Sequence, residues 1–290
     1  DSNFVANPDI CEAGNGDIHV VWEDWEDGNY PGFGKSVDGG NTFTTGKITT
    51  WDGCKFPLVA PLGPSNGSQA LMSFTKMKTG ESNDIYYSIY NGSNWSTAAQ
   101  TGMVADNGYM IEGICRALND GTVYRLYGRK SGSDFVLAYR RYNGSYWDPE
   151  MVVYTGGFYA RQSIAVNPAG QVMVVYEQDE VVRTKLYTPG YGWSAEMQQE
   201  YKSTHSAITA IPGTNDFYLV YTYDMKRIYG RRFSGGGWLP KELVSVGLPD
   251  AFTVGADVAA DPNGSGTVYA CWEYWGSGNC QQHFSIRPGG

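Results

Sequence analysis

Two sets of aromatic residues recur along the chain at intervals of about fifty positions. The first set ends short apolar runs that follow a turn rich in Gly or Asn, and its members are Trp22, Phe74, Tyr127, Tyr176, Tyr221 and Trp272. The second set follows a turn at the end of another run, and its members are Phe43, Trp95, Trp147, Trp193 and Trp238. Successive members lie 45 to 53 residues apart, and the two sets stay in phase.

Repeats of this length that each hold several short strands are typical of propeller blades. Runs such as DIHVVWE and QVMVVYE are suited to strands covered on both faces, and helical periodicity is absent. Six copies of the first aromatic set therefore predict an all-β fold, a single six-bladed β-propeller of four-stranded blades over residues 1–290. The expected blades span roughly residues 8–52, 53–104, 105–157, 158–202, 203–248 and 249–290.

The last repeat has no copy of the second aromatic set, because the chain stops after NCQQHFSIRPGG. We expect the N-terminal segment, residues 1–7, to supply the missing outer strand. Such a strand would close the ring and leave no long open sheet edge.

The charge balance narrows the classes of partner. With 21 Lys and Arg against 30 Asp and Glu, the formal net charge is −9, which argues against nucleic acid and against anionic membrane surfaces. No apolar run approaches the roughly 20 residues that span a bilayer, so membrane insertion is not expected. No signal peptide is present in the sequence, which predicts a mature chain or an excised domain. We expect a secreted or cell-surface protein.

The five cysteines allow one disulfide but do not form the pattern of a metal site. Cys271 and Cys280 flank WEYWGSGN, and a cross-strand disulfide between them is expected, whereas the other three have no obvious partner. No Cys-x-x-Cys or His-Cys cluster exists, so no zinc site and no cofactor are expected. The acidic loop WEDWEDGN, residues 22–29, is a weak candidate for calcium because it lacks the alternating spacing of a defined calcium loop.

The stretch SVDGGNTF, residues 36–43, carries strong turn chemistry at Asp38-Gly39-Gly40. It resembles the Asp-box, or bacterial neuraminidase repeat, of the sialidase-like propellers, and the repeats resemble that family over nearly the whole chain. Only the first copy carries the full pattern. The resemblance implies a corner between the third and fourth strands of a blade, where Asp38 stabilises the turn and Phe43 anchors it.

The same resemblance implies an Arg-Ile-Pro element at the first inner strand of an active sialidase. Here the matching stretch is VANPDIC, with Asn7 and Pro8 where Arg and Ile are expected. Arg287, in SIRPGG, falls after the third strand of the sixth blade instead. Without the first Arg a substrate carboxylate loses a bidentate contact worth about 2–3 kcal/mol, so hydrolysis of sialosides is not expected.

Function is expected on the loops that precede the inner strands and on those that join second to third strands. Aromatic planes beside carboxylates and guanidinium groups suit sugars. The alternative for each residue is an ordinary solvated loop. The candidate ligand-binding residues are Asp24, Trp25, Arg129, Tyr159, Arg161, Tyr223, Tyr274 and Trp275.

The favoured function is extracellular, lectin-like recognition of an oligo- or polysaccharide around the central axis. An enzyme acting on polysaccharide is the alternative, either a glycoside hydrolase with paired carboxylates such as Glu23 and Glu177, or a uronate lyase using His205 with Tyr and Arg. For His205 a buried, hydrogen-bonded structural role is favoured over the catalytic one. A structural or protein-binding surface propeller is the second alternative.

Overall fold

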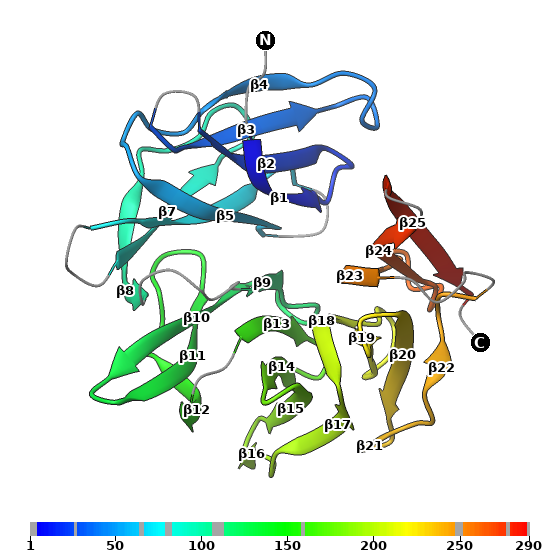
Figure 1. Ribbon diagram of the computed structural model, residues 1–290. Helices are drawn as coiled ribbons and strands as arrows, with labels where there is room; N and C mark the ends of the chain where they lie inside the picture. The colour runs from blue at the N-terminus through cyan, green and yellow to red at the C-terminus, as the bar shows by residue number, and fades with distance from the viewer. Residues whose placement is uncertain are drawn as a thin grey trace. The chain divides into compact units, whose positions relative to one another are not determined.

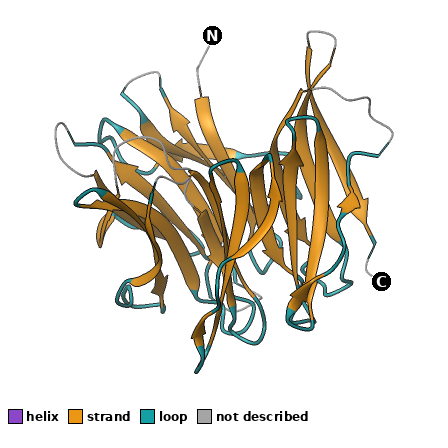
Figure 2. Ribbon diagram, turned by 60° about the horizontal axis from the view of Figure 1, so that its bottom comes forward, coloured by secondary structure: helices purple, strands orange, loops and turns teal. Residues whose placement is uncertain are grey.

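The computed structural model describes residues 5–25, 28–63, 67–78, 83–105, 113–157, 160–246, 252–276 and 279–288. Over these residues the chain consists of strands, turns and loops without a helix (Figure 2). The described part accordingly contains no helix that is long and apolar enough to cross a membrane.

The chain divides into two compact units, of which the first comprises residues 1–116 and 120–156. It holds three antiparallel sheets of four strands, each paired in chain order (Figure 1). The strands are β1 (Val5–Glu12), β2 (Ile18–Asp24), β3 (Tyr30–Ser36) and β4 (Thr44–Lys47); β5 (Cys54–Pro61), β6 (Ala70–Lys76), β7 (Asn83–Tyr90) and β8 (Ala99–Ala105); and β9 (Gly113–Arg116), β10 (Val123–Ser131), β11 (Asp134–Tyr142) and β12 (Met151–Gly156).

The second unit comprises residues 117–119 and 157–290 and also holds three antiparallel sheets. Its strands are β13 (Ala160–Val166), β14 (Val172–Gln178), β15 (Val181–Thr188), β16 (Gly192–Trp193) and β17 (Met197–Tyr201); β18 (Ser203–Ala210), β19 (Phe217–Tyr223), β20 (Arg227–Ser234), β21 (Gly237–Trp238) and β22 (Glu242–Leu243); and β23 (Phe252–Ala260), β24 (Val268–Gly276) and β25 (Asn279–Arg287). In the first two sheets the outer strand is divided into two short segments that pair with the same neighbour.

The number of sheets, six, is the number that the aromatic repeat predicts. The last sheet has three strands among the described residues, β23 to β25. Of the N-terminal segment expected to complete it, residues 1–4 lie outside the described residues. Residues 5–7 belong to β1 instead, where Val5 and Ala6 pair with Asp24 and Glu23 of β2. That part of the expected outer strand is therefore the beginning of the first sheet.

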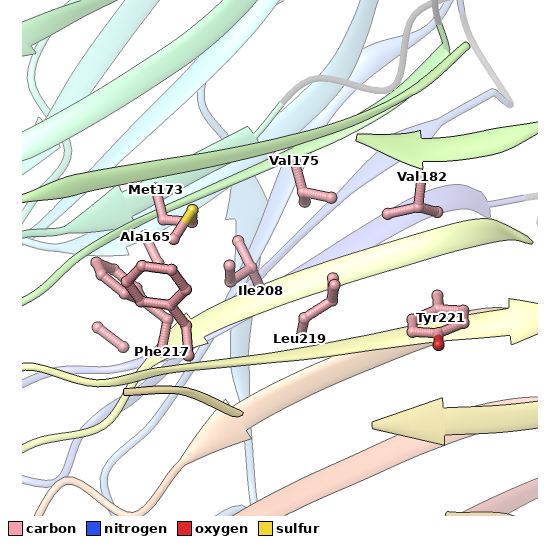
Figure 3. Close-up of a cluster of buried hydrophobic side chains, with 10 residues drawn as sticks. Ala165, Met173, Val175, Val182, Ile208, Phe217, Leu219 and Tyr221 are labelled. Atoms are coloured by element: carbon pink, nitrogen blue, oxygen red, sulfur yellow. The ribbon is translucent and has the colours of Figure 1, made fainter. Parts of the chain in front are cut away.

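Within the second unit the core fills the space between neighbouring sheets (Figure 3). Met173, Val175 and Val182 on β14 and β15 meet Phe217 and Leu219 on β19 across this space, and all five side chains are fully buried. Because sheets pack on both sides of such a strand, both of its faces are apolar, as the Val-rich runs predicted. Each such side chain contributes about 1.5–3 kcal/mol by leaving water.

In four sheets a tryptophan of the second aromatic set packs against an aromatic residue at the end of the third strand, across the turn between them. In the second sheet Tyr90 ends β7 and pairs across the turn with Trp95, with ring centroids 5.5 Å apart. The equivalent pairs, with centroids 5.2 to 5.5 Å apart, are Tyr142–Trp147, Tyr187–Trp193 and Phe233–Trp238. The regular spacing of these residues in the sequence therefore reflects one repeated corner.

The corner after β3 is built around Asp38. Its carboxylate accepts hydrogen bonds from the Thr42 backbone amide at 2.9 Å, the Thr42 hydroxyl at 2.6 Å and the Ser36 hydroxyl at 2.7 Å. These bonds, led by those from Thr42, lower the pKa of Asp38 to about 2. Asp38 stabilises the turn as expected, while Phe43 lies beside Gly34 and stays 43% exposed, so it anchors the corner only in part.

The expected disulfide between Cys271 and Cys280 is not formed. In the register of β24 and β25, Cys271 lies opposite Phe284 and Cys280 lies opposite Trp275. The two thiols are thus offset by four residues along the strands, about 13 Å, which exceeds the reach of a disulfide. The sequence spacing was right for adjacent strands, but the register was not.

We predict that Gly230→Ala destabilises the protein by about 1–3 kcal/mol. A methyl group at Gly230 in β20 would lie 2.7 Å from Cζ of Tyr218, which is buried and donates its hydroxyl to Glu242 at 2.6 Å. Gly237→Ala is the matched control, because its methyl group would meet nothing within 4 Å. Urea unfolding should separate the two variants, and equal midpoints would contradict the packing described here.

Candidate functional site

A β-bulge interrupts the first strand of five of the six sheets. At each bulge one residue adopts a left-handed backbone conformation, and these residues are Asn7, Phe56, Arg161, His205 and Gly255. The corresponding part of the remaining sheet, residues 106–112, lies outside the described residues. Four of the five are not glycine, although a left-handed backbone there costs about 1–3 kcal/mol each. Bulges of this kind redirect side chains and often lie beside functional sites.

Glu23, at the end of β2, holds two of these bulges in the first unit. Its Oε1 accepts hydrogen bonds from the Asn7 side-chain amide and from the Phe56 backbone amide, both at 2.7 Å. Its Oε2 accepts a third bond from the indole Nε1 of Trp25 at 2.8 Å. The side chain is only 1% exposed. Glu23 therefore joins the first sheet to the second and fixes the indole at the same time.

Trp25 is 44% exposed although its Nε1 is hydrogen-bonded. The ammonium group of Lys55 lies 5.7 Å from the centre of its ring. Asp24, the neighbouring candidate, forms an ion pair with Lys47 at 3.7 Å. The candidate calcium loop contains residues 26 and 27, which lie outside the described residues.

The last sheet repeats this arrangement. Glu273 on β24 corresponds to Glu23 on β2, because each pairs with the last residue before the bulge of the first strand. Trp275 follows Glu273 by two residues, as Trp25 follows Glu23. The Trp275 Nε1 donates to Glu273 Oε2 at 3.4 Å, and the indole is 47% exposed. WEDW and WEYW are therefore two copies of one motif, Trp-Glu-x-Trp, in which the glutamate holds an exposed indole.

Glu177 and Arg161 are brought together in the second unit by β14 and the bulge of β13, and the bulge of β18 brings the backbone next to His205 to the same carboxylate. Glu177 Oε1 accepts a hydrogen bond from the Ser206 backbone amide at 3.1 Å, beside His205. Burial raises the pKa of Glu177 to about 8, although the positive charge of Arg161 opposes the shift. Burial also lowers the pKa of Arg161, whose buried Nη1 has no hydrogen-bond partner among the described residues. The His205 Nδ1 lies 2.9 Å from the hydroxyl of Thr204.

This pKa shift predicts a pH dependence of stability that belongs to Glu177. Below about pH 4.5 its carboxyl group is protonated in both the folded and the unfolded chain; above that pH the unfolded chain ionises first, so stability falls until about pH 8. We expect the melting temperature of the wild type, relative to Glu177→Gln, to decline across this window and to level off above it. A constant difference from pH 4 to pH 9 would contradict the assignment.

The other predicted residues are not gathered with these. Arg129 on β10 makes a bidentate ion pair with Glu150, at 2.6 and 3.0 Å, so its charge is already matched. Tyr223 packs against Tyr229 at 5.8 Å, with Lys241 over its ring. Tyr274 is only 8% exposed and packs against His283. Tyr159 lies outside the described residues.

Four contributors were not among the site residues predicted from the sequence: Asn7, Phe56, Lys55 and Glu273. Asn7 and Phe56 take part through a bulge that no local pattern signals, and Lys55 lies next to that bulge. The Trp-Glu-x-Trp repeat was the available signal for Glu273, because the same four-residue spacing occurs in the first and last repeats.

Comparisons with known proteins concern the fold alone. No family profile and no curated protein matches the sequence. A protein of unknown function from Dyadobacter fermentans is similar in structure, with a TM-score of 0.66 and 14% identity, covering 98% of this chain and 95% of that one. A Hadza microbial sialidase gives a TM-score of 0.65 at 13% identity, covering 98% of this chain and 65% of its own.

A lectin of Aleuria aurantia, solved with Fucα1-6GlcNAc, gives a TM-score of 0.62 at 13% identity and covers 97% of this chain and 94% of its own. The fold is a six-bladed β-propeller. The similar sialidases are longer, and this chain spans about two thirds of the Hadza enzyme and about half of the Trypanosoma rangeli sialidase. The likeness to sialidases is one of fold, and the Asp-box resemblance stays a prediction.

Proposed function

We propose that this protein is an extracellular, lectin-like propeller that binds oligo- or polysaccharide without cleaving it. Binding would use its loop face, the surface formed where the second strands of the sheets end and the loops to the third strands begin. The observation that carries the proposal is the pair of exposed indoles of Trp25 and Trp275, each held by a hydrogen bond from its Nε1 to a glutamate. A large aromatic surface fixed in place yet open to solvent is a preorganised binding element. The apolar C–H face of a pyranose fits such a ring.

The polar surroundings support a sugar over an apolar ligand. Lys55 lies beside the Trp25 ring, and the partly exposed Glu273 lies at the edge of the Trp275 indole. Sugar hydroxyl groups require directional donors and acceptors of this kind around the stacking surface. The solved structures of similar fold include a lectin and sialidases, which supports carbohydrate as the ligand class.

The sialidase reaction is not part of the proposal. Asn7 stands where the family carries its first substrate-binding Arg, and its side chain is committed to Glu23. A fluorogenic sialoside should therefore remain uncleaved. Release of sialic acid would overturn the binding-only assignment.

A glycan array tests the proposal directly. The fluorescently labelled protein is expected to bind a limited set of glycans, and the double variant Trp25→Ala/Trp275→Ala is expected to lose them. Absence of binding across a broad array would overturn the proposal in favour of a structural or protein-binding propeller.

One observation favours an enzyme as a second candidate. A carboxyl group with a pKa of about 8, near Arg161 and bonded to the Ser206 amide that follows His205 in the chain, can deliver a proton at neutral pH, which a glycoside hydrolase or a lyase requires. Incubation with a panel of polysaccharides, followed by assays for reducing ends and for unsaturated uronates, tests this. Activity that is lost in both Glu177→Gln and His205→Ala would establish it, and no activity on any member of the panel would reject it.

A further inference from the structure

A groove of about 520 Å³ lies in the first unit, between the outer part of its first sheet and a turn of its second sheet. β3 and β4 form one wall, and the turn after β7 forms the other. The groove is lined by, among others, Phe33, Lys35, Thr44, Lys47, Tyr90 and Trp95. The volume lies within the range of about 300–1,000 Å³ that is typical of small-molecule sites.

Aromatic side chains make the apolar part of the groove rigid. Trp95 packs against Phe33 with ring centroids 5.8 Å apart and against Tyr90 at 5.5 Å. Tyr90 is in turn fixed by Lys35, whose ammonium lies 3.3 Å from its hydroxyl. These rings are held by their contacts with one another and with the neighbouring sheet, so a ligand need not order them on binding.

The charges of the groove are already balanced. The Lys35 ammonium pairs with Asp17 at 2.6 Å, and the Lys47 ammonium pairs with Asp24 at 3.7 Å. An acidic ligand would have to compete with these carboxylates. Thr42, Thr44, Ser93 and Asn94 add hydroxyl and amide groups along the groove. The lining thus combines aromatic and aliphatic side chains with neutral polar groups, which suits the apolar C–H faces and the hydroxyl groups of a pyranose.

We propose that this groove is a second carbohydrate site, which takes a neutral hexopyranose and is separate from the exposed tryptophans. Phe33, Tyr90 and Trp95 supply the apolar surface, while the threonine, serine and asparagine groups meet the sugar hydroxyls. The site depends on none of the residues used in the proposed function, so it stands or fails independently of the loop face.

The probes are the methyl glycosides of glucose, galactose, mannose and fucose, with sialic acid and glucuronic acid as charged comparators. Saturation-transfer NMR and titration calorimetry should detect at least one neutral glycoside at millimolar concentration. Thr44→Tyr, which fills the groove, should weaken that binding at least tenfold. Thr45→Tyr is the matched control, because Thr45 is exposed on the same strand but does not line the groove.

Three results would overturn the proposal: no neutral glycoside bound, binding unchanged in Thr44→Tyr, or preference for the acidic sugars. If Thr44→Tyr fails to fold, Ser93→Tyr provides the same block from the opposite wall. The double variant Trp25→Ala/Trp275→Ala is expected to keep this binding. Its loss there, with Thr44→Tyr unaffected, would assign the signal to the loop face instead.

Discussion

Replacing Glu23 with alanine is expected to lower the free energy of unfolding by about 3–5 kcal/mol. The substitution removes a buried acceptor of three part-buried hydrogen bonds at once, and a typical bond contributes about 0.5–1.5 kcal/mol, more where the acceptor is charged. It also releases the left-handed backbone at Phe56, which Glu23 holds. For a chain of this length the melting temperature should fall by on the order of ten degrees.

Two further variants make this result specific. Asp134→Asn, an exposed acid in the same unit, should change the free energy of unfolding by less than about 0.5 kcal/mol. Glu23→Gln should lie between the wild type and alanine, because an amide oxygen can still accept some of the bonds. A melting temperature for Glu23→Ala within one or two degrees of the Asp134→Asn value would show that the carboxyl group does not join the two sheets.

The second large effect is expected on binding. Trp25→Ala should weaken the best glycan found on an array at least tenfold, because a buried aromatic contact at the centre of a site is commonly worth about 2 kcal/mol or more. Titration calorimetry gives the dissociation constant. Tyr146→Ala is the control, since Tyr146 is 63% exposed but lies at the corner after β11.

The two copies of the motif give this experiment a second arm. Trp275→Ala is expected to produce a loss of similar kind for the glycan that its own indole contacts. Unchanged dissociation constants in Trp25→Ala, in Trp275→Ala and in the double variant would remove the tryptophans from the binding surface.

The fold could be predicted because its determinants are local and repeated. Each Tyr–Trp or Phe–Trp pair, such as Tyr90 with Trp95, joins residues only a few positions apart, so the sequence spacing records the corner directly. The number of corners and strand-ending aromatics then fixes the number of sheets. Register is not recorded in this way, and for that reason the pairing of Cys271 with Cys280 was wrong.

The candidate site was predictable only in part, for the same reason. Trp25 and Trp275 could be identified from a four-residue motif. The partner of Arg129 is Glu150, which directly precedes β12, two strands away from β10, and only the pairing of these strands decides that they meet. Tyr274 shares a face of β24 with the buried Trp272, and the alternation of faces along a strand turns it inward. The bulge at Phe56 has no sequence signal of its own.

The measurement that tests the central claim most directly is the ¹⁵N indole spectrum of the protein during titration with its best array glycan. The account predicts that the Nε1 resonance of Trp25, of Trp275 or of both moves in proportion to occupancy, while those of the corner residues Trp147 and Trp238 stay in place. Saturating binding with both loop-face resonances unmoved would contradict it.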